Sequence, residues 1–279
     1  MNPETTITTM TLALAGFSFM LTVIWGTPLL RLLRYLKIGK QIRVDGPERH
    51  FSKRGTPTMG GIMIVIPVVL VTVMLNAVNL IGLPTGVGRS ILVPTGTMIL
   101  FTLLGAVDDW QGLRGRREAQ GMRARTKFLF QWLFAIGIAW AIQYLLKSPD
   151  MYLPGFKGEI RIGLLYIPVA AFVIVTMSNA INIIDGLDGM AGLISATAFV
   201  AYGGIAILQG QIFVARFCFT VVGALFGFLW FNVHPAQLFM GDTGALSLGA
   251  VLAVVALMTG QWVLLPVIAI VPLSVLASS

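Results

Sequence analysis

The stretch NAINIIDGLDGM, residues 179–190, separates two of the most apolar runs in the chain and carries two aspartates three positions apart. An ionised carboxylate is costly near hydrocarbon unless a cation or a hydrogen-bond donor satisfies it. If the turn continues as a helix, Asp185 and Asp188 face the same way, because side chains three positions apart are neighbours on a helix. The stretch therefore predicts a polar site where one membrane helix ends and the next begins.

Composition supports a membrane protein. Of the 279 residues, 57% are hydrophobic and only 11% are charged, whereas soluble domains carry roughly 25% charged residues. The net charge of +8 does not indicate nucleic-acid binding, because the basic residues cluster in particular loops and form no basic domain. We therefore expect an all-α, polytopic integral membrane protein and no nucleic-acid partner.

Apolar runs long enough to cross a bilayer recur along the whole chain. A transmembrane helix needs about 20 apolar residues, and fewer where the membrane is thin. The sequence predicts nine spans, at residues 7–30, 59–78, 91–107, 128–146, 164–183, 190–208, 212–231, 245–258 and 263–276. The first run lacks a basic start and a small-residue cleavage site, so it is expected to be a retained helix and no signal peptide.

Positive residues predict the orientation of these spans. Eight of the 19 Lys and Arg residues fall between the first two spans, and six more fall between the third and fourth spans. The loops on the opposite side carry only Arg89, Lys147, Lys157 and Arg161. Because basic loops stay in the cytoplasm, the N-terminus is predicted to lie outside. Asp108, Asp109, Asp185, Asp188 and Asp242 then all fall at cytoplasmic helix ends, where they can converge on one acidic site.

The pair in VDDWQG, residues 107–112, has two interpretations. Adjacent carboxylates repel each other, so Asp108 and Asp109 either meet a metal ion or a basic substrate group, or are solvated acids closing the third span beside Arg114, Arg116 and Arg117.

The other acidic segments also have a structural alternative. Asp188 and Asp242 each precede or begin an apolar run, as N-capping residues do. The alternative is function: Asp242 with the Asp108–Asp109 pair would suit Mg²⁺, which takes one or two carboxylates plus substrate phosphate oxygens. Asn179 and Asn182 add amide groups to an otherwise apolar span. His234, followed by Pro235, reads as a turn residue.

Five motifs give the chain a resemblance to a known family. They are DGPERHFSKRGTPTMGG, VDDW, ARTKFLFQ, NAINIIDGLDGMAG and FNVHPAQLFMGDTGALSLG, and they cover nearly the whole chain. In these segments the sequence resembles the polyprenyl-phosphate N-acetylhexosamine-1-phosphate transferases, and GTPTMGG favours the branch acting on muramoyl-pentapeptide. The resemblance implies transfer from UDP-MurNAc-pentapeptide to undecaprenyl phosphate, giving lipid I and UMP with Mg²⁺. It also implies a homodimer in the bacterial inner membrane and an active site facing the cytoplasm.

The same resemblance implies roles for individual residues. Asp242 matches the magnesium ligand, Asp108 the group that activates the lipid phosphate, and Asp109 its acidic neighbour. Lys127 and Asn232 match polar positions of the active-site region, where Lys127 would stabilise added charge. The positions associated with nucleotide and substrate binding are Lys53, Thr58, Asn179, Asn182, Asp185, Asp188 and Phe239.

The chain departs from the family pattern at two points. The family lysine three residues after the DD pair is Gly112 here, and Arg114 and Arg116 are the candidates to replace it, although Arg and Lys are not interchangeable at a tuned site. The family also carries a histidine-rich loop and a tenth helix after the ninth span, whereas only His50 and His234 are present here. We expect residues 1–279 to form one transmembrane transferase domain that lacks its C-terminal part.

Three alternatives remain open at this point. A transferase for a simpler UDP-N-acetylhexosamine would share most of the motifs. A secondary transporter would place ionisable residues near mid-bilayer in repeated halves, and the aspartates here lie at helix ends instead. An inactive scaffold is suggested only by the missing C-terminal features.

Overall fold

The computed structural model describes residues 3–36, 38–39, 56–82, 90–114, 121–148, 151–153, 155–156 and 158–279. Within these ranges the regular structure is helical, apart from an isolated antiparallel bridge between Gly39 and Pro57. The predicted all-α class is therefore confirmed.

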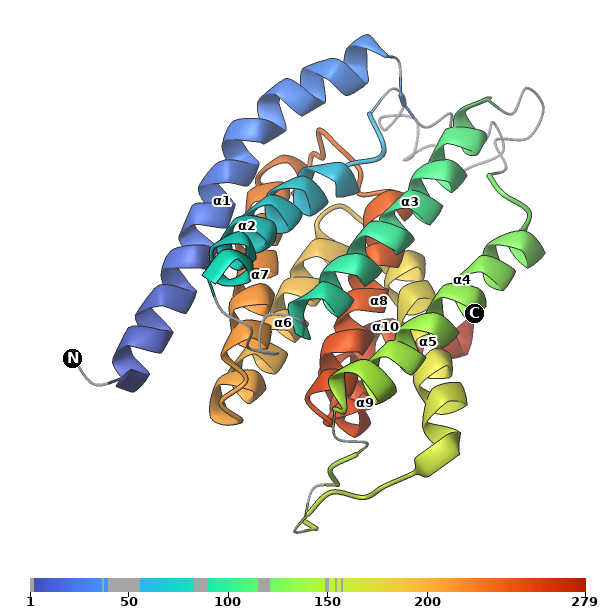
Figure 1. Cartoon of the computed structure of the whole chain (residues 1–279). Coiled ribbons are helices and arrows are strands. Elements are labelled where there is room, and N and C mark those ends of the chain that lie inside the picture. The colour runs from blue at the N-terminus through green and yellow to red at the C-terminus, as the bar shows by residue number, and fades with distance from the viewer. Residues whose placement is uncertain are drawn as a thin grey trace.

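Each of the first eight predicted spans overlaps one helix (Figure 1). In chain order they are α1 (Pro3–Tyr35), α2 (Gly61–Gly82), α3 (Leu92–Arg114), α4 (Ala124–Trp140) with a π-helical continuation at Ala141–Leu146, α5 (Tyr166–Ile184), α6 (Met190–Leu208), α7 (Ile212–Asn232), α8 (Asp242–Met258), α9 (Leu265–Ile268) and α10 (Ile270–Ser278). Among the described residues, six helical stretches are long and apolar enough to cross a membrane, in α1 and in α3 to α7. Shorter apolar helices lie at Gly61–Leu75 and Asp242–Met258. The chain is a multi-pass membrane protein, as predicted.

The ninth predicted span is not one helix. Ala269 separates α9 from α10 in a non-helical conformation, with φ −110° and ψ 39°. Pro272 lies in the first turn of α10, and proline has no backbone N–H to continue a helix from the preceding turn. The apolar run at 263–276 therefore breaks into two short helices.

Helix α8 forms the centre of the bundle. All its residues from 243 to 258 are buried, and it packs chiefly against α3 and α5 (Figure 1). Glycines allow this close approach, since a Cβ at Gly61 would overlap the backbone of Gly244 and a Cβ at Gly249 would overlap Met177. Small residues are the usual means of tight helix packing in membranes, where lipid competes with apolar side chains.

Four helix ends meet at one end of the bundle. There α3 and α5 end, and α4 and α8 begin (Figure 1). We refer to this as the Asp242 end, after the first residue of α8. Helix α7 begins at the opposite end of the bundle. Helix α1 lies alongside α7 over much of its length.

Candidate active site

The two adjacent aspartates lie inside α3. The helix continues to Arg114, so the prediction that the third span closes at residue 107 is wrong by two turns. Consecutive residues of a helix point about 100° apart, and Asp108 and Asp109 accordingly contact different neighbours. The repulsion expected between adjacent carboxylates is therefore reduced by geometry.

Asp109 caps the N-terminus of α8. Its Oδ1 accepts a hydrogen bond from the backbone N–H of Asp242 at 3.2 Å, and its Oδ2 accepts one from the N–H of Thr243 at 3.0 Å. The hydroxyl of Thr243 also donates to Oδ2. A carboxylate here satisfies N–H groups that the helix leaves free and complements its dipole. The capping role considered for Asp242 itself is wrong, because the cap comes from α3 and the cap position, Gly241, has no capping side chain.

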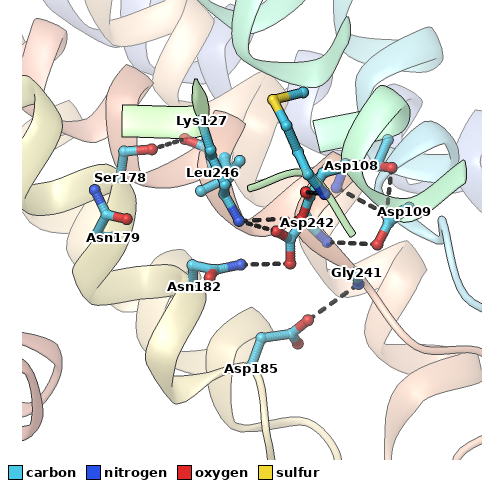
Figure 2. Close-up of polar contacts among 12 residues, drawn as sticks. Asp108, Asp109, Lys127, Ser178, Asn179, Asn182, Asp185, Gly241, Asp242 and Leu246 are labelled. Carbon is cyan, nitrogen blue, oxygen red and sulfur yellow. Dashed lines mark hydrogen bonds and ion pairs between the residues drawn. The ribbon is translucent and has the colours of Figure 1, made fainter. Parts of the chain in front are cut away.

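Lys127 joins Asp108 and Asp242. Its Nζ lies 3.2 Å from Oδ2 of Asp108 and is in direct contact with Oδ2 of Asp242. Asn182 donates to Oδ1 of Asp242 at 2.8 Å, and the N–H of Met122 donates to Oδ1 of Asp108 at 2.6 Å. Figure 2 shows side chains from α3, α4 and α5 meeting at the first residue of α8. We call Asp108, Lys127, Asn182 and Asp242 the Asp242 cluster.

The Asp242 cluster is accessible and acidic. Exposed fractions of the Lys127, Asp108 and Asp242 side chains are 16%, 13% and 23%, so a ligand can reach them. Within the described part of the chain, no three His, Cys, Asp or Glu side chains form a group that could hold a metal ion by themselves. Mg²⁺ typically uses one or two carboxylates together with phosphate oxygens and water. Asp242, with Asp108 beside it, fits this second mode.

The connection between α5 and α6 holds the connection between α7 and α8. Asp185 accepts a hydrogen bond from the N–H of Gly241 at 3.0 Å (Figure 2). Asp188 lies 3.0 Å from Nδ1 of His234 and accepts from the N–H of Ala236 at 3.3 Å. The capping role considered for Asp188 is wrong, since α6 is preceded by Gly189 in the left-handed conformation with φ +79°. Both aspartates instead fix the loop that leads into Asp242.

Asn232 locks the same two connections together. Its buried side chain accepts a hydrogen bond from the N–H of Gly189 at 2.9 Å and donates to the carbonyl of Leu238 at 2.8 Å. Thus Asn232 positions these two connections, and its amide has two hydrogen-bond partners within the fold.

The segment before α2 forms a further wall of the site. The N–H of Phe239 donates to the carbonyl of Pro57 at 2.8 Å, and the N–H of Gly60 donates to the carbonyl of Phe239 at 2.8 Å. Thr58 is buried, and its hydroxyl lies beside Gly241, where a Cβ would come within 2.7 Å of it. A side chain at Gly241 would also meet the Asp109 carboxylate. This glycine, with φ +70°, is a site residue that the sequence interpretation missed.

Asn179 lies apart from Asp242 and pairs with Gln131 of α4. Its Nδ2 donates to Oε1 of Gln131 at 2.9 Å and to the carbonyl of Val175 at 2.8 Å. Both amides line a cavity of about 420 Å³ between α4 and α5, together with Arg125, Lys127 and Phe128. Gln131 was not predicted, although a glutamine within an apolar run is a signal of a polar function or contact.

Two expectations fall partly outside the described residues. Lys53 lies there, as do Arg116 and the side chain of Arg114. Gly112 is on α3 opposite Gly121, and a Cβ at Gly112 would lie 3.7 Å from the nitrogen of Gly121 in ordinary contact.

Comparisons with known proteins agree on one family. A model of glycosyl transferase family 4 matches residues 91–260, and a phospho-N-acetylmuramoyl-pentapeptide-transferase signature matches residues 53–65. The phospho-N-acetylmuramoyl-pentapeptide-transferase of Chloroflexus aurantiacus is 48% identical over 267 residues, which cover 93% of this chain and 71% of the relative. The enzymes of the same name from Geobacillus kaustophilus and Rubrobacter xylanophilus are 41% and 37% identical, over 90% and 91% of this chain and 76% of each relative.

Proposed function

The chain belongs to glycosyl transferase family 4 and, within it, to the phospho-N-acetylmuramoyl-pentapeptide-transferases, and we propose that it catalyses the reaction that this name describes. Phospho-MurNAc-pentapeptide passes from UDP-MurNAc-pentapeptide to undecaprenyl phosphate. An oxygen of the acceptor phosphate forms a bond to the sugar-linked phosphorus, and the bond from that phosphorus to UMP breaks. The lipid product is an intermediate of peptidoglycan synthesis.

The Asp242 cluster is the observation that carries this proposal. Phosphoryl transfer depends mostly on positioning the reactants and neutralising their charge. The cluster offers a cation, Lys127, between two carboxylates, and it lies at helix ends where a water-soluble nucleotide and a membrane lipid can both arrive.

We propose distinct roles for the members of the cluster. Asp108 takes the remaining proton of the acceptor phosphate, while Lys127 stabilises negative charge on the transferred group. Asp242 would hold Mg²⁺, which when bound supplies charge neutralisation at the diphosphate. Asp109 acts through Asp242, because its carboxylate is occupied by three donors at the start of α8.

The nucleotide side of the site is proposed to lie around the loop that leads into Asp242. The residues on or against this loop are Asn182, Asp185, Asp188, Asn232, Phe239 and Thr58. Lys53 would belong with them from outside the described residues. For Asn179 we propose a role in the cavity next to Lys127, since its amide pairs with Gln131 and both side chains line that cavity.

The membrane and assembly proposals follow from the family. We place the protein in the bacterial cytoplasmic membrane with its Asp242 end facing the cytoplasm, where nucleotide sugars occur and where the basic loops predict that end to lie. We also propose a homodimer, which light scattering of the purified protein can test.

Mass spectrometry of the lipid product tests the proposed function. Purified protein with Mg²⁺ and undecaprenyl phosphate is given UDP-MurNAc-pentapeptide in one reaction and UDP-N-acetylglucosamine in another. We expect the muramoyl-pentapeptide lipid in the first reaction and no sugar-linked lipid in the second. Transfer of N-acetylglucosamine phosphate alone would overturn the substrate assignment and favour a relative acting on simpler sugars.

A further inference from the structure

Arg216 is a cation inside a membrane helix. It lies four residues after the start of α7 at Ile212, about 6 Å along the helix axis. It takes no part in the proposed reaction, because Asn232, at the other end of α7, is roughly 24 Å away. Ionisable residues within membrane spans are rare and usually have a function.

Among the described residues, the guanidinium of Arg216 has few partners. One terminal nitrogen donates to the sulfur of Met10 at 3.4 Å, a weak acceptor, and the group lies 6.0 Å from the ring centre of Phe213. Its Nε is buried without a hydrogen-bond partner, and no carboxylate among the described residues forms an ion pair with it. Arg216 as a whole is only partly buried, and its contact with Met10 is exposed, so a ligand can reach the guanidinium. An ionised side chain within a membrane span is costly without an anion, which suggests that an anion outside the chain completes this environment.

A cavity of about 470 Å³ lies next to this guanidinium. It is formed by α1, α2 and α7 with Ile91 before α3, and its lining is apolar apart from Arg216, Thr72 and Thr220. The hydroxyl of Thr220 donates to the carbonyl of Arg216 at 2.8 Å, so its proton is not offered to a ligand. Met10 and Met74 line the cavity and are 45% and 59% exposed. In a bilayer, this exposed surface would be accessible to lipid.

We propose that this cavity binds an anionic phospholipid, whose phosphate contacts Arg216 and whose acyl chain occupies the space between α1, α2 and α7. A guanidinium presents paired donors that match phosphate oxygens and is more easily desolvated than an ammonium. The apolar walls suit an acyl chain and exclude a fully hydrated inorganic ion. We refer to this site as the Arg216 cavity.

Thermal unfolding of the whole purified protein in neutral detergent tests this site. The probes are dioleoylphosphatidylglycerol, dioleoylphosphatidylcholine with the same acyl chains, inorganic phosphate and undecaprenyl phosphate. The variants are Arg216→Gln, which removes the charge, and Met74→Trp, which fills space in the cavity from an exposed position. Arg161→Gln is the matched control, because Arg161 is 85% exposed and lies 4.0 Å from Glu159.

We expect phosphatidylglycerol to raise the Tm of the parent protein, because a ligand that binds the folded state stabilises it. Arg216→Gln should raise the apparent Kd for this lipid by about tenfold or more, as for loss of a charge-assisted hydrogen bond. Met74→Trp should also weaken binding, whereas Arg161→Gln should bind like the parent. Without lipid, Arg216→Gln should have a Tm at or above that of the parent.

Several results would overturn the proposal. Equal stabilisation by phosphatidylcholine or inorganic phosphate would exclude an anionic lipid as the occupant. An Arg216-dependent shift with undecaprenyl phosphate but not phosphatidylglycerol would assign the cavity to the acceptor substrate. If Met74→Trp binds phosphatidylglycerol like the parent, the lipid lies elsewhere.

Discussion

The polar side chains at the two ends of α7 differ in how well their hydrogen-bonding groups are satisfied. At the Asp242 end, Asn232 makes two hydrogen bonds within the fold, and the neighbouring aspartates receive donors from other helices. At the other end, the guanidinium of Arg216 lies near a sulfur and an aromatic ring, and its buried Nε has no hydrogen-bond partner among the described residues.

This difference distinguishes two kinds of polar side chain. Those at the Asp242 end stabilise the fold through their hydrogen bonds, whereas Arg216 is proposed to bind a ligand. A buried polar group that loses its partner costs free energy, whereas removing an already unpaired one can be neutral or stabilising. Substitutions at the Asp242 end should therefore reduce activity or stability, whereas Arg216→Gln should not lower the Tm in the absence of phospholipid.

The largest effect is expected from Asp242→Asn. The substitution keeps the size of the side chain but removes the charge that contacts Lys127 and would hold Mg²⁺. We predict a loss of about 10³-fold in the rate of UMP release, since charge stabilisation usually contributes most of the rate enhancement in such reactions. The Tm, measured in parallel, should change little. A variant that keeps a tenth of the parent rate would contradict the role of Asp242.

Asp109→Ala should lower the free energy of unfolding more than a substitution of Asp108 does. It leaves the N–H groups of Asp242 and Thr243 without their acceptor, and we expect a loss of about 2–3 kcal/mol in folding free energy together with reduced activity. Asp108→Asn is the matched variant, because it should reduce activity at a nearly unchanged Tm. Equal unfolding behaviour of the two variants would contradict the capping role of Asp109.

Two glycines of α3 test the close packing that positions Asp242. A Cβ at Gly105 would overlap the backbone carbonyl of Asp242, while a Cβ at Gly96 would meet nothing within 4 Å. Gly105→Ala should cost about 1–3 kcal/mol through overpacking and should lower UMP release as well. Gly96→Ala should be neutral or stabilising by up to about 1 kcal/mol, because alanine is the better helix former. Denaturation and activity of both variants should be measured in the same detergent.

The smallest expected effect concerns the amide pair of Gln131 and Asn179. Gln131→Leu should cost about 1 kcal/mol, because polar contacts between membrane helices are individually weak and Asn179 keeps its bond to Val175. The double variant with Asn179→Leu should regain part of that loss, since it leaves no amide unpaired. Additive losses in a double-mutant cycle would show that the two amides are not coupled.

Much of the fold could be predicted because hydropathy and charge are local properties of the sequence. The spans and the gathering of aspartates at helix ends follow from them. The partners of each aspartate could not be predicted, because the cap of α8 comes from α3, more than 130 residues earlier in the sequence. The break at Ala269 was missed because an apolar run says nothing of backbone conformation, although Pro272 was a visible warning.

Arg216 shows a different kind of omission. The prediction of orientation used only the basic residues of the loops. Arg216 lies within the apolar run at 212–231 and was therefore not considered. Its position was a readable signal, because an ionisable residue inside a span is a site hypothesis by default. The cavity and the missing partner required the structure.

The Asp242 cluster is proposed to transfer phospho-MurNAc-pentapeptide to a lipid phosphate, and one assay tests this most directly. UMP release should be measured with UDP-MurNAc-pentapeptide and Mg²⁺, with and without undecaprenyl phosphate, for the parent protein and for folded Asp242→Asn. We predict UMP release by the parent only when the acceptor lipid is present, and none above background from the variant. UMP release at equal rates by the two proteins would contradict the proposed role of the Asp242 cluster in the transfer.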